Sequence, residues 1–158
     1  MAEHVTPTTR PRSAQLIDLA QRDVVTVAPE TTLAECAQLM RQEHVGSVVV
    51  LAQDKPVGIV TDRDIVIEAV AVQLDPATLT AGDVMSEPLA TVRESEDLLD
   101  ALARMREHGV RRLPVVDGSG KLSVLLAVDN VLEVLAEQVD SVVRVVKAEQ
   151  TKESALRQ

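Results

Sequence analysis

The sequence predicts an α+β fold made of two copies of one strand-helix-strand-strand-helix unit. Shifting the sequence by 65 positions aligns residues 13–71 with residues 78–136 without a gap. In each copy, Val-rich runs of strand length alternate with segments whose apolar residues recur at helical spacing. The 158-residue chain contains no Phe, Tyr or Trp, so both copies must build their cores from aliphatic side chains and Met. A chance ungapped register over nearly sixty residues is improbable, so the sequence predicts a duplicated unit.

The repeat rests on identical residues and on a wider match of apolar positions. Met40-Arg41 falls on Met105-Arg106, and Asp64 falls on Asp129. We expect repeat 1 to span residues 13–75 and repeat 2 to span residues 76–138.

Each copy gives the same order of elements. The strands of repeat 1 are expected at 24–27, 47–51 and 57–61, with helices beginning after Thr31 or Thr32 and at Asp62. The strands of repeat 2 are expected at 89–92, 113–116 and 122–126, with helices at 96–108 and 129–137.

Two segments lie outside the repeats. Residues 1–12 are rich in Thr, Pro and Arg and are expected to be a disordered arm. Residues 139–158 form a C-terminal helix or tail, in which Val139, Val142 and Val146 share one helical stripe with Val143. That stripe either packs on its own domain or makes a dimer contact.

Composition excludes several functions. A net charge of −9 disfavours nucleic acid and anionic membranes as partners, and no apolar run approaches the length of a membrane span. A single cysteine, Cys36, and the lack of a signal peptide indicate a cytoplasmic protein. Three histidines and one cysteine at these spacings predict no metal site, and no catalytic motif is present, so we expect no enzyme.

Two segments carry a family resemblance. The sequence GIVTDRDI at 58–65 and the sequence GVRRLPVVD at 109–117 resemble the signature segments of CBS domains, and the likeness extends over residues 13–138. The resemblance implies two repeats packed sheet to sheet with pseudo-twofold symmetry, the arrangement called a Bateman module. Such modules commonly dimerise into a disk of four repeats, bind adenosine-containing ligands and regulate an attached or partner protein.

The Thr-x-x-Asp pattern suits a nucleotide on chemical grounds. Thr61 ends a buried strand and Asp64 falls in the first turn of the next helix, so both lie at the mouth of the sheet. A carboxylate can accept two hydrogen bonds from the vicinal hydroxyls of ribose. Thr-x-x-Asp is also close to a capping-box pattern, and a purely structural cap is the alternative interpretation.

The resemblance implies a role for each residue of this site. Asp64 would hold the ribose, Thr61 would contact the ribose or the α-phosphate, and Arg63 would reach the phosphates. The residues that would enclose the adenine are Val24, Val25 and Thr26 through their backbone, and Ile59 and Val48 through their side chains.

Repeat 2 departs from the pattern. In the ungapped register Leu126 replaces Thr61 and is expected to crowd the phosphate position, while Asp129 is kept. We therefore expect one good site, built on repeat 1, and a second site that is weak or empty. The basic cluster His108–Arg112 should place Arg111 and Arg112 at the cleft facing the polyphosphate, unless these arginines are simply paired with nearby carboxylates.

These observations favour a regulatory module that binds AMP, ADP or ATP between its repeats and signals through the conformation of a homodimer to a regulated protein. No cofactor is expected beyond this regulatory ligand, although S-adenosylmethionine or a cyclic dinucleotide would also suit such a site. The alternative is a constitutive homodimer scaffold with a degenerate pocket. Inosine monophosphate dehydrogenases carry similar CBS pairs, but the chain lacks the roughly 250 residues of a catalytic barrel.

Overall fold

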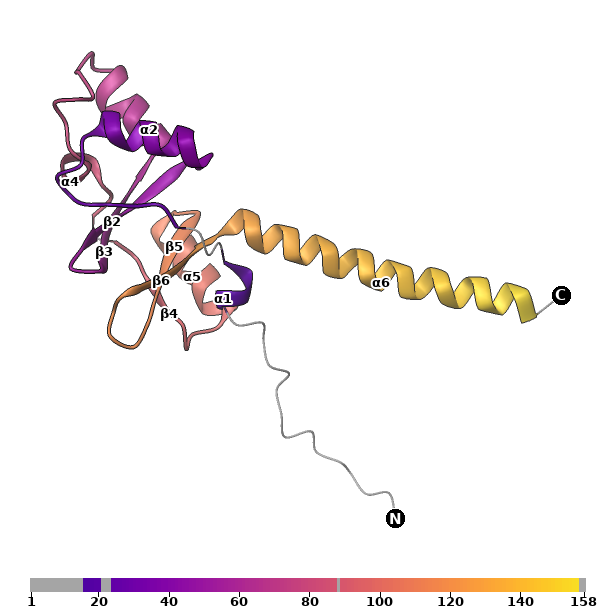
Figure 1. Cartoon of the computed structure of the whole chain (residues 1–158). Coiled ribbons are helices and arrows are strands. Elements are labelled where there is room, and N and C mark those ends of the chain that lie inside the picture. The colour runs from indigo at the N-terminus through magenta and orange to yellow at the C-terminus, as the bar shows by residue number, and fades with distance from the viewer. Residues whose placement is uncertain (1–15, 21–23, 88, 157–158) are drawn as a thin grey trace.

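The computed structural model describes residues 16–20, 24–87 and 89–156 (Figure 1). The arm predicted at residues 1–12 lies outside these residues. Within the described chain, no helix combines the length and the apolar character needed to cross a membrane.

The strands form two three-stranded sheets of the same topology. The first sheet has the order β1 (Thr26–Val27), β2 (Ser47–Ala52), β3 (Lys55–Thr61). The second has the order β4 (Val92–Arg93), β5 (Arg112–Val116), β6 (Leu122–Ala127). In each sheet the first strand pairs parallel to the second, and the second pairs antiparallel to the third. The predicted α+β fold with two repeats is confirmed.

The helices are α1 (Leu16–Leu19), α2 (Leu33–Glu43), α3 (Asp62–Ile65), α4 (Ala81–Val84), α5 (Leu98–His108) and α6 (Val128–Leu156). One π-helical turn, η1 (Val66–Val70), continues α3. Thr32 caps α2 through a capping box with Glu35, and Asp97 caps α5 in the same way with Asp100. The short helices α1 and α4 were not predicted from the sequence.

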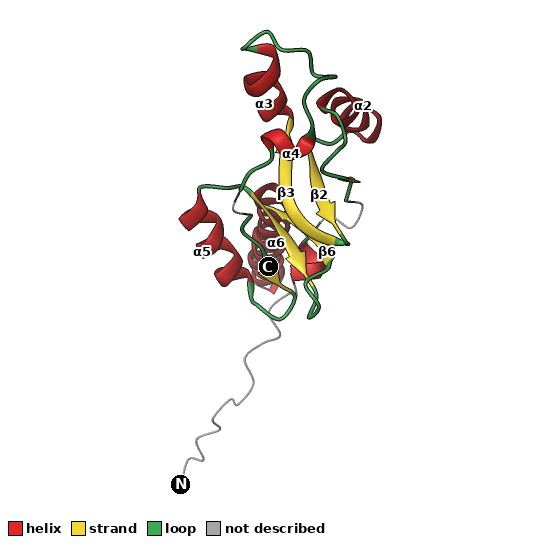
Figure 2. Cartoon of the chain, turned by 90° about the vertical axis from the view of Figure 1, so that its left-hand side faces the viewer, coloured by secondary structure: helices red, strands yellow, loops and turns green. Residues whose placement is uncertain are grey.

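The two sheets pack face to face. Val49 and Ile59 of the first sheet and Leu125 of the second form a buried apolar cluster, with Leu51, Leu89 and Leu122 packed against it. Figure 2 shows the sheets side by side, with α2 and α3 at one end of the pair and α5 at the other. The apolar core residues of the described chain are aliphatic, sulfur-containing or Pro, as a chain without aromatic residues requires.

The short helix that precedes each repeat packs on the other repeat. Leu16 and Leu19 of α1 are buried with Val92, Leu113 and other core residues of repeat 2. Conversely, Ala81 of α4 is buried in the core of repeat 1. In Figure 1, α1 accordingly lies beside α5 and β6 rather than beside α2. This exchange determines which segments of chain meet at the clefts described below.

The ungapped repeat register is wrong after the hairpins. Val50 pairs with Gly58 in the first sheet, and Val115 pairs with Val124 in the second. Val115 lies 65 positions after Val50, but Val124 lies 66 positions after Gly58, so the second hairpin holds one extra residue.

The shifted register changes the counterparts of the Thr-x-x-Asp residues. Ala127, which directly precedes α6, takes the place of Thr61, and Asn130 takes the place of Asp64. Leu126 is fully buried in the core of repeat 2, so the prediction that it crowds a phosphate position is also wrong.

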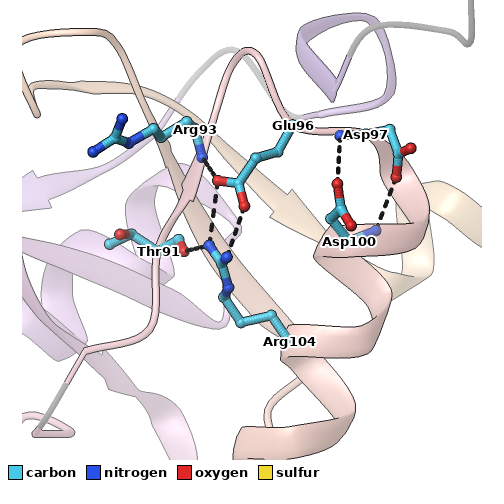
Figure 3. A network of polar contacts seen from close by, with 6 residues as sticks. All are labelled: Thr91, Arg93, Glu96, Asp97, Asp100 and Arg104. Atoms are coloured by element: carbon cyan, nitrogen blue, oxygen red, sulfur yellow. Dashed lines mark hydrogen bonds and ion pairs between the residues drawn. The ribbon is translucent and has the colours of Figure 1, made fainter.

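A polar network holds the chain between β4 and α5 (Figure 3). The Glu96 carboxylate accepts a hydrogen bond from the Arg93 amide at 2.7 Å and pairs with the Arg104 guanidinium at 2.7 Å. Arg104 also donates to the Thr91 carbonyl. The Glu96 carboxylate thus links the segment that precedes α5 to β4 and to the middle of α5.

α6 is one continuous helix that leaves the body of the molecule (Figure 1). Val131 is buried and Val134 is half-buried on repeat 2, but the described side chains from Leu135 to Lys152 are all exposed. The interpretation that Val139, Val142 and Val146 pack on their own domain is therefore wrong.

Candidate functional site

A cleft of about 660 Å³ opens where β3 and the start of α3 face repeat 2. We call it the Thr61 cleft. Repeat 1 contributes Ile59, Thr61, Asp62 and Arg63 to its wall. The other wall is formed by Ser86, Glu87, Leu89, Ala90 and residues 108–112.

The exchange of α4 brings the second wall into place. Because α4 packs on repeat 1, the chain that follows it runs along β3, and the Ser86 amide donates to the Ile59 carbonyl at 3.1 Å. Gly58 permits this close approach, since a Cβ there would lie 2.6 Å from the Met85 Cβ. The Gly of the GIVT sequence therefore has a packing role that positions the cleft.

Thr61 and Asp64 form a complete capping box at the start of α3. Oδ2 of Asp64 accepts hydrogen bonds from the Thr61 amide at 2.8 Å and from the Thr61 hydroxyl at 2.7 Å. The Thr61 hydroxyl in turn accepts a bond from the Asp64 amide at 3.2 Å. The cap fixes the Thr61 hydroxyl at the edge of the cleft, whereas Asp64 is half-buried and does not line it.

Basic side chains line the Thr61 cleft together with its apolar residues. Arg63, Arg111, Arg112 and His108 line it, against the two carboxylates Asp62 and Glu87. The basic cluster therefore lies at the cleft between the repeats, where the sequence analysis placed it.

The arginines of the cleft differ in their pairing. Arg111 makes an ion pair with Asp129 at 2.7 Å, as the alternative interpretation expected. Both side chains of that pair are mostly exposed, so the pair is weak and readily exchanged for another anion. Within the described chain, no ion pair joins Arg63 or Arg112 to a carboxylate.

A second, smaller cleft is the pseudo-twofold counterpart of the first. It measures about 180 Å³ and is lined by Val24, Val25, Leu125, Arg112 and residues 44–47. We call it the Val24 cleft. Leu125 stands where Ile59 stands in the Thr61 cleft, and Val24 and Val25 stand where Leu89 and Ala90 stand.

The structure separates residues that the sequence analysis had grouped around one adenine. Val24 and Val25 lie at the Val24 cleft because α1, which precedes them, packs on repeat 2. Thr26 is exposed and lines a different, shallow pocket with Leu51. Val48 is fully buried in the core of repeat 1, so it cannot contact a ligand. Of that group, Ile59 lines the Thr61 cleft.

Sequence reasoning missed Leu89, Ala90 and Val110 as apolar residues of the Thr61 cleft. The signal was present, because Leu89 and Ala90 lie 65 positions after Val24 and Val25. The assignment to the other repeat could not be made without knowing that the helices exchange.

A further cavity of about 760 Å³ lies at the hairpin end of the sheets. It includes Lys55, Arg93 and Arg104, but Arg104 is already held by Glu96. Pro56 and Val116 are its only large apolar lining residues in the described chain, so it lacks the apolar wall that a purine needs.

No group of three or more His, Cys, Asp or Glu side chains in the described residues is arranged to hold a metal ion. Cys36 is fully buried, and burial raises the pKa of its thiol. It is part of the core of repeat 1.

The fold and the paired clefts define a tandem-repeat module with one ligand-sized cleft and a smaller counterpart between its halves. The model of the CBS domain family matches residues 16–70 and 81–137, so the chain belongs to the CBS domain family as a tandem pair.

Curated proteins align with most of this chain. An uncharacterised protein of Methanopyrus kandleri is 40% identical over 124 residues, which cover 78% of this chain and 63% of that protein. A CBS domain-containing protein of Bacillus subtilis is 36% identical over 108 residues, covering 68% of this chain and 76% of that protein.

Solved structures of the same fold include a ligand complex. A CBS domain protein from Pyrobaculum aerophilum complexed with AMP is 29% identical, with a TM-score of 0.67, and the match covers 74% of this chain and 89% of that one. Hypoxic Response Protein I with two coordinated zinc ions is 31% identical, with a TM-score of 0.67, covering 76% of this chain and 98% of that one.

Proposed function

We propose that the chain is a non-catalytic regulatory module that binds an adenine nucleotide in the Thr61 cleft. One observation carries the proposal: a single cleft joins an aliphatic wall to three arginines in a chain whose net charge is −9. The cleft volume of about 660 Å³ lies within the range of small-molecule sites. The AMP complex of the Pyrobaculum aerophilum relative supports the choice of ligand.

The lining of the cleft offers both kinds of contact that a nucleotide needs. Without aromatic residues, the base must lie between aliphatic side chains, and Ile59, Leu89 and Val110 provide them. Arg63 and Arg112 then receive the phosphates, since planar guanidinium groups bind phosphate oxygens in pairs.

Asp64 supports the Thr61 cleft without lining it. Its Oδ2 is engaged by Thr61, and the side chain lies outside the cleft lining. Asp64 therefore acts as a positioning residue that holds the Thr61 hydroxyl toward the ribose or α-phosphate. A direct bond from Asp64 to the ribose hydroxyls stays a prediction.

Regulation follows from the position of the ligand between the repeats. A nucleotide that contacts both walls of the Thr61 cleft stabilises the conformation in which the two walls are close together. This binding shifts the population of dimer conformations, and a partner protein recognises the favoured one. The expected module is a homodimer that reports the energy or metabolite state of the cell.

Calorimetric titration with AMP, ADP, ATP and adenosine tests the proposal. We expect binding of at least one nucleotide, and a rise of unfolding free energy of about 2.7 kcal/mol at 100 times its Kd. The double variant Arg63→Ala/Arg112→Ala should weaken nucleotide binding at least about tenfold, because each lost phosphate contact is charge-assisted. It should change adenosine binding little, because adenosine has no phosphate. Arg144→Ala, on the exposed part of α6, is the matched control.

A constitutive homodimer scaffold with a degenerate pocket is the second candidate. It is favoured by the engagement of Asp64 in the cap and by the small volume, about 180 Å³, of the Val24 cleft. Absence of any stabilisation by millimolar adenine nucleotide would establish the scaffold over the sensor. Because the chain has no aromatic residues, unfolding must be followed by far-ultraviolet circular dichroism or calorimetry rather than by intrinsic fluorescence.

A further inference from the structure

The first turn of α6 differs from the starts of α2, α3, α4 and α5. Each of those helices begins with a capping box, in which the side chain three residues after the cap residue accepts a bond from the cap amide. α6 begins after Ala127, which has no polar side chain. Oδ1 of Asn130, three residues further on, is buried and has no hydrogen-bond partner in the described chain. The start of α6 must therefore be held by other contacts.

Arg111, which lines the Thr61 cleft, makes two of these contacts. Its carbonyl accepts a hydrogen bond from the Val128 amide at 2.9 Å, and its guanidinium donates to Oδ1 of Asp129 at 2.7 Å. Val128 and Asp129 are the first two residues of α6. The described side chains from Leu135 to Lys152 are exposed, so the helix is attached to the body of the molecule only near this end. One arginine thus links the Thr61 cleft to the attached end of α6.

The Asp129 carboxylate occupies a group that the proposed ligand would use. Of the three arginines that line the Thr61 cleft, only Arg111 has an ion pair with a carboxylate in the described chain. Carboxylate and phosphate oxygens bind a guanidinium group in the same way. Two anions at one guanidinium repel each other, and an ion pair whose side chains are 70% and 58% exposed is weak. A phosphate at Arg111 would therefore take the place of the Asp129 carboxylate.

We propose that Asp129 competes with the phosphates of the nucleotide for Arg111, and that a nucleotide which displaces Asp129 releases the first turn of α6. The proposal rests on the proposed nucleotide site in the Thr61 cleft and adds a route from that site to α6. It gives Asp129 the opposite effect from a ligand contact, because the carboxylate weakens nucleotide binding.

The first test is calorimetric titration of the full chain with AMP, ADP and ATP at low ionic strength, where an exposed ion pair is least screened. Asp129→Asn removes the charge and keeps the shape of the side chain. It should lower the Kd of the nucleotide that binds most tightly by about two- to fivefold, which is the range for an exposed ion pair. A Kd that rises or stays unchanged in Asp129→Asn overturns the proposal.

The matched control is Glu133→Gln, which removes the same charge from an exposed side chain one turn further along α6. It should change the Kd little, and an equal fall of the Kd in both variants overturns the proposal because it would reflect only the net charge of the chain. Adenosine has no phosphate, so it should bind the wild type and Asp129→Asn equally.

A double-mutant cycle shows whether Asp129 acts through Arg111. Arg111→Ala and the double variant Arg111→Ala/Asp129→Asn should bind the nucleotide with the same Kd, because the competition needs the guanidinium group. If Asp129→Asn lowers the Kd as much without Arg111 as with it, the competition for Arg111 is overturned.

Hydrogen exchange followed by mass spectrometry tests the release of α6. Saturating nucleotide should speed exchange in peptides that cover residues 128–134 by about two- to fivefold, since the ion pair at the first turn is lost. Asp129→Asn should show the faster exchange without nucleotide and no further rise with it. α2, which does not line the Thr61 cleft, is the control segment. Exchange that nucleotide leaves unchanged or slows in the wild type overturns the release of α6.

Failure of this proposal is distinguishable from failure of the proposed function. Nucleotide binding with the same Kd in the wild type and Asp129→Asn overturns the competition and leaves the nucleotide site standing. Absence of binding by AMP, ADP and ATP overturns the nucleotide site and the competition together.

Discussion

At the level of single residues, the chain contains two nearly identical capping boxes with different surroundings. Thr61–Asp64 and Thr80–Asp83 each have a carboxylate oxygen 2.8 Å from the Thr amide, and the hydroxyl contacts measure 2.7 and 2.9 Å. Thr61 lines the cleft, whereas Thr80 and Asp83 line none of the clefts described above. Substitutions in the Thr80–Asp83 capping box therefore measure the effect of the cap on stability, separately from ligand binding.

Asp64→Asn and Asp83→Asn separate capping from ligand binding. Each should lower the free energy of unfolding, Asp64→Asn by about 0.5–1 kcal/mol, because a neutral amide holds the Thr amide and hydroxyl less strongly. Asp64→Asn alone should weaken nucleotide binding, by about tenfold, since Thr61 is then less well held at the cleft. Urea denaturation and calorimetric titration of the two variants provide the measurements. Unchanged affinity in Asp64→Asn would reduce Asp64 to a structural cap.

At the level of elements, the sequence predicted the strands and long helices because their apolar periodicity is local. It could not predict the register after the hairpins. The turn between β2 and β3 uses Gln53 and Asp54 with positive φ, whereas residues 117–121 connect β5 to β6. Identities such as Asp64 with Asp129 favoured the ungapped alignment although Asn130 is the true counterpart.

The residues of the Thr61 cleft were predicted only where a local sequence pattern indicated them. Thr61 ends a strand, Arg63 comes just after it, and the basic cluster leads directly into another strand, so the local pattern placed all of them at the mouth of the sheets. The adenine wall depends on the exchange of α1 and α4, which is decided by packing between distant segments. A helix of four residues such as α4 has too few positions to show which core it joins.

The contribution of Glu96 to the stability of the fold should depend on pH. The Arg93 amide, followed by the Arg104 guanidinium, lowers the pKa of Glu96 below its usual 4.5. A carboxylate with a lowered folded-state pKa stabilises the fold above its unfolded pKa, and this contribution is lost as the pH falls through the folded-state value.

Glu96→Gln should therefore cost about 1 kcal/mol at pH 7, and the difference from the wild type should shrink as the pH falls below 4.5. Denaturation by urea at a series of pH values measures it. Glu133→Gln, an exposed carboxylate on α6, is the control and should show no such convergence. A difference that persists unchanged at pH 3 would exclude the ionised network as its source.

At the scale of the whole molecule, the exchange of α1 and α4 ties the two repeats into one cooperative unit. Each core contains a helix that belongs in sequence to the other repeat. If either repeat unfolds, the core of the other repeat loses the helix that packs in it. The same exchange places the ligand wall of one repeat against the sheet of its neighbour, so stability and the geometry of the cleft depend on the same contacts.

Leu16→Ala tests this coupling, because Leu16 is fully buried in the core of repeat 2 whereas Cys36 is fully buried in the core of repeat 1. The cavity should cost about 2–5 kcal/mol. If the repeats unfold together, the urea midpoint for reaction of the Cys36 thiol with a disulfide reagent must fall as far as the midpoint seen by circular dichroism. Leu99→Ala, on the exposed face of α5, should move neither midpoint by more than a small amount. A Cys36 midpoint that stays at the wild-type value while the dichroism midpoint falls would show that repeat 1 folds independently, and the cleft would then be a contact between two separate domains.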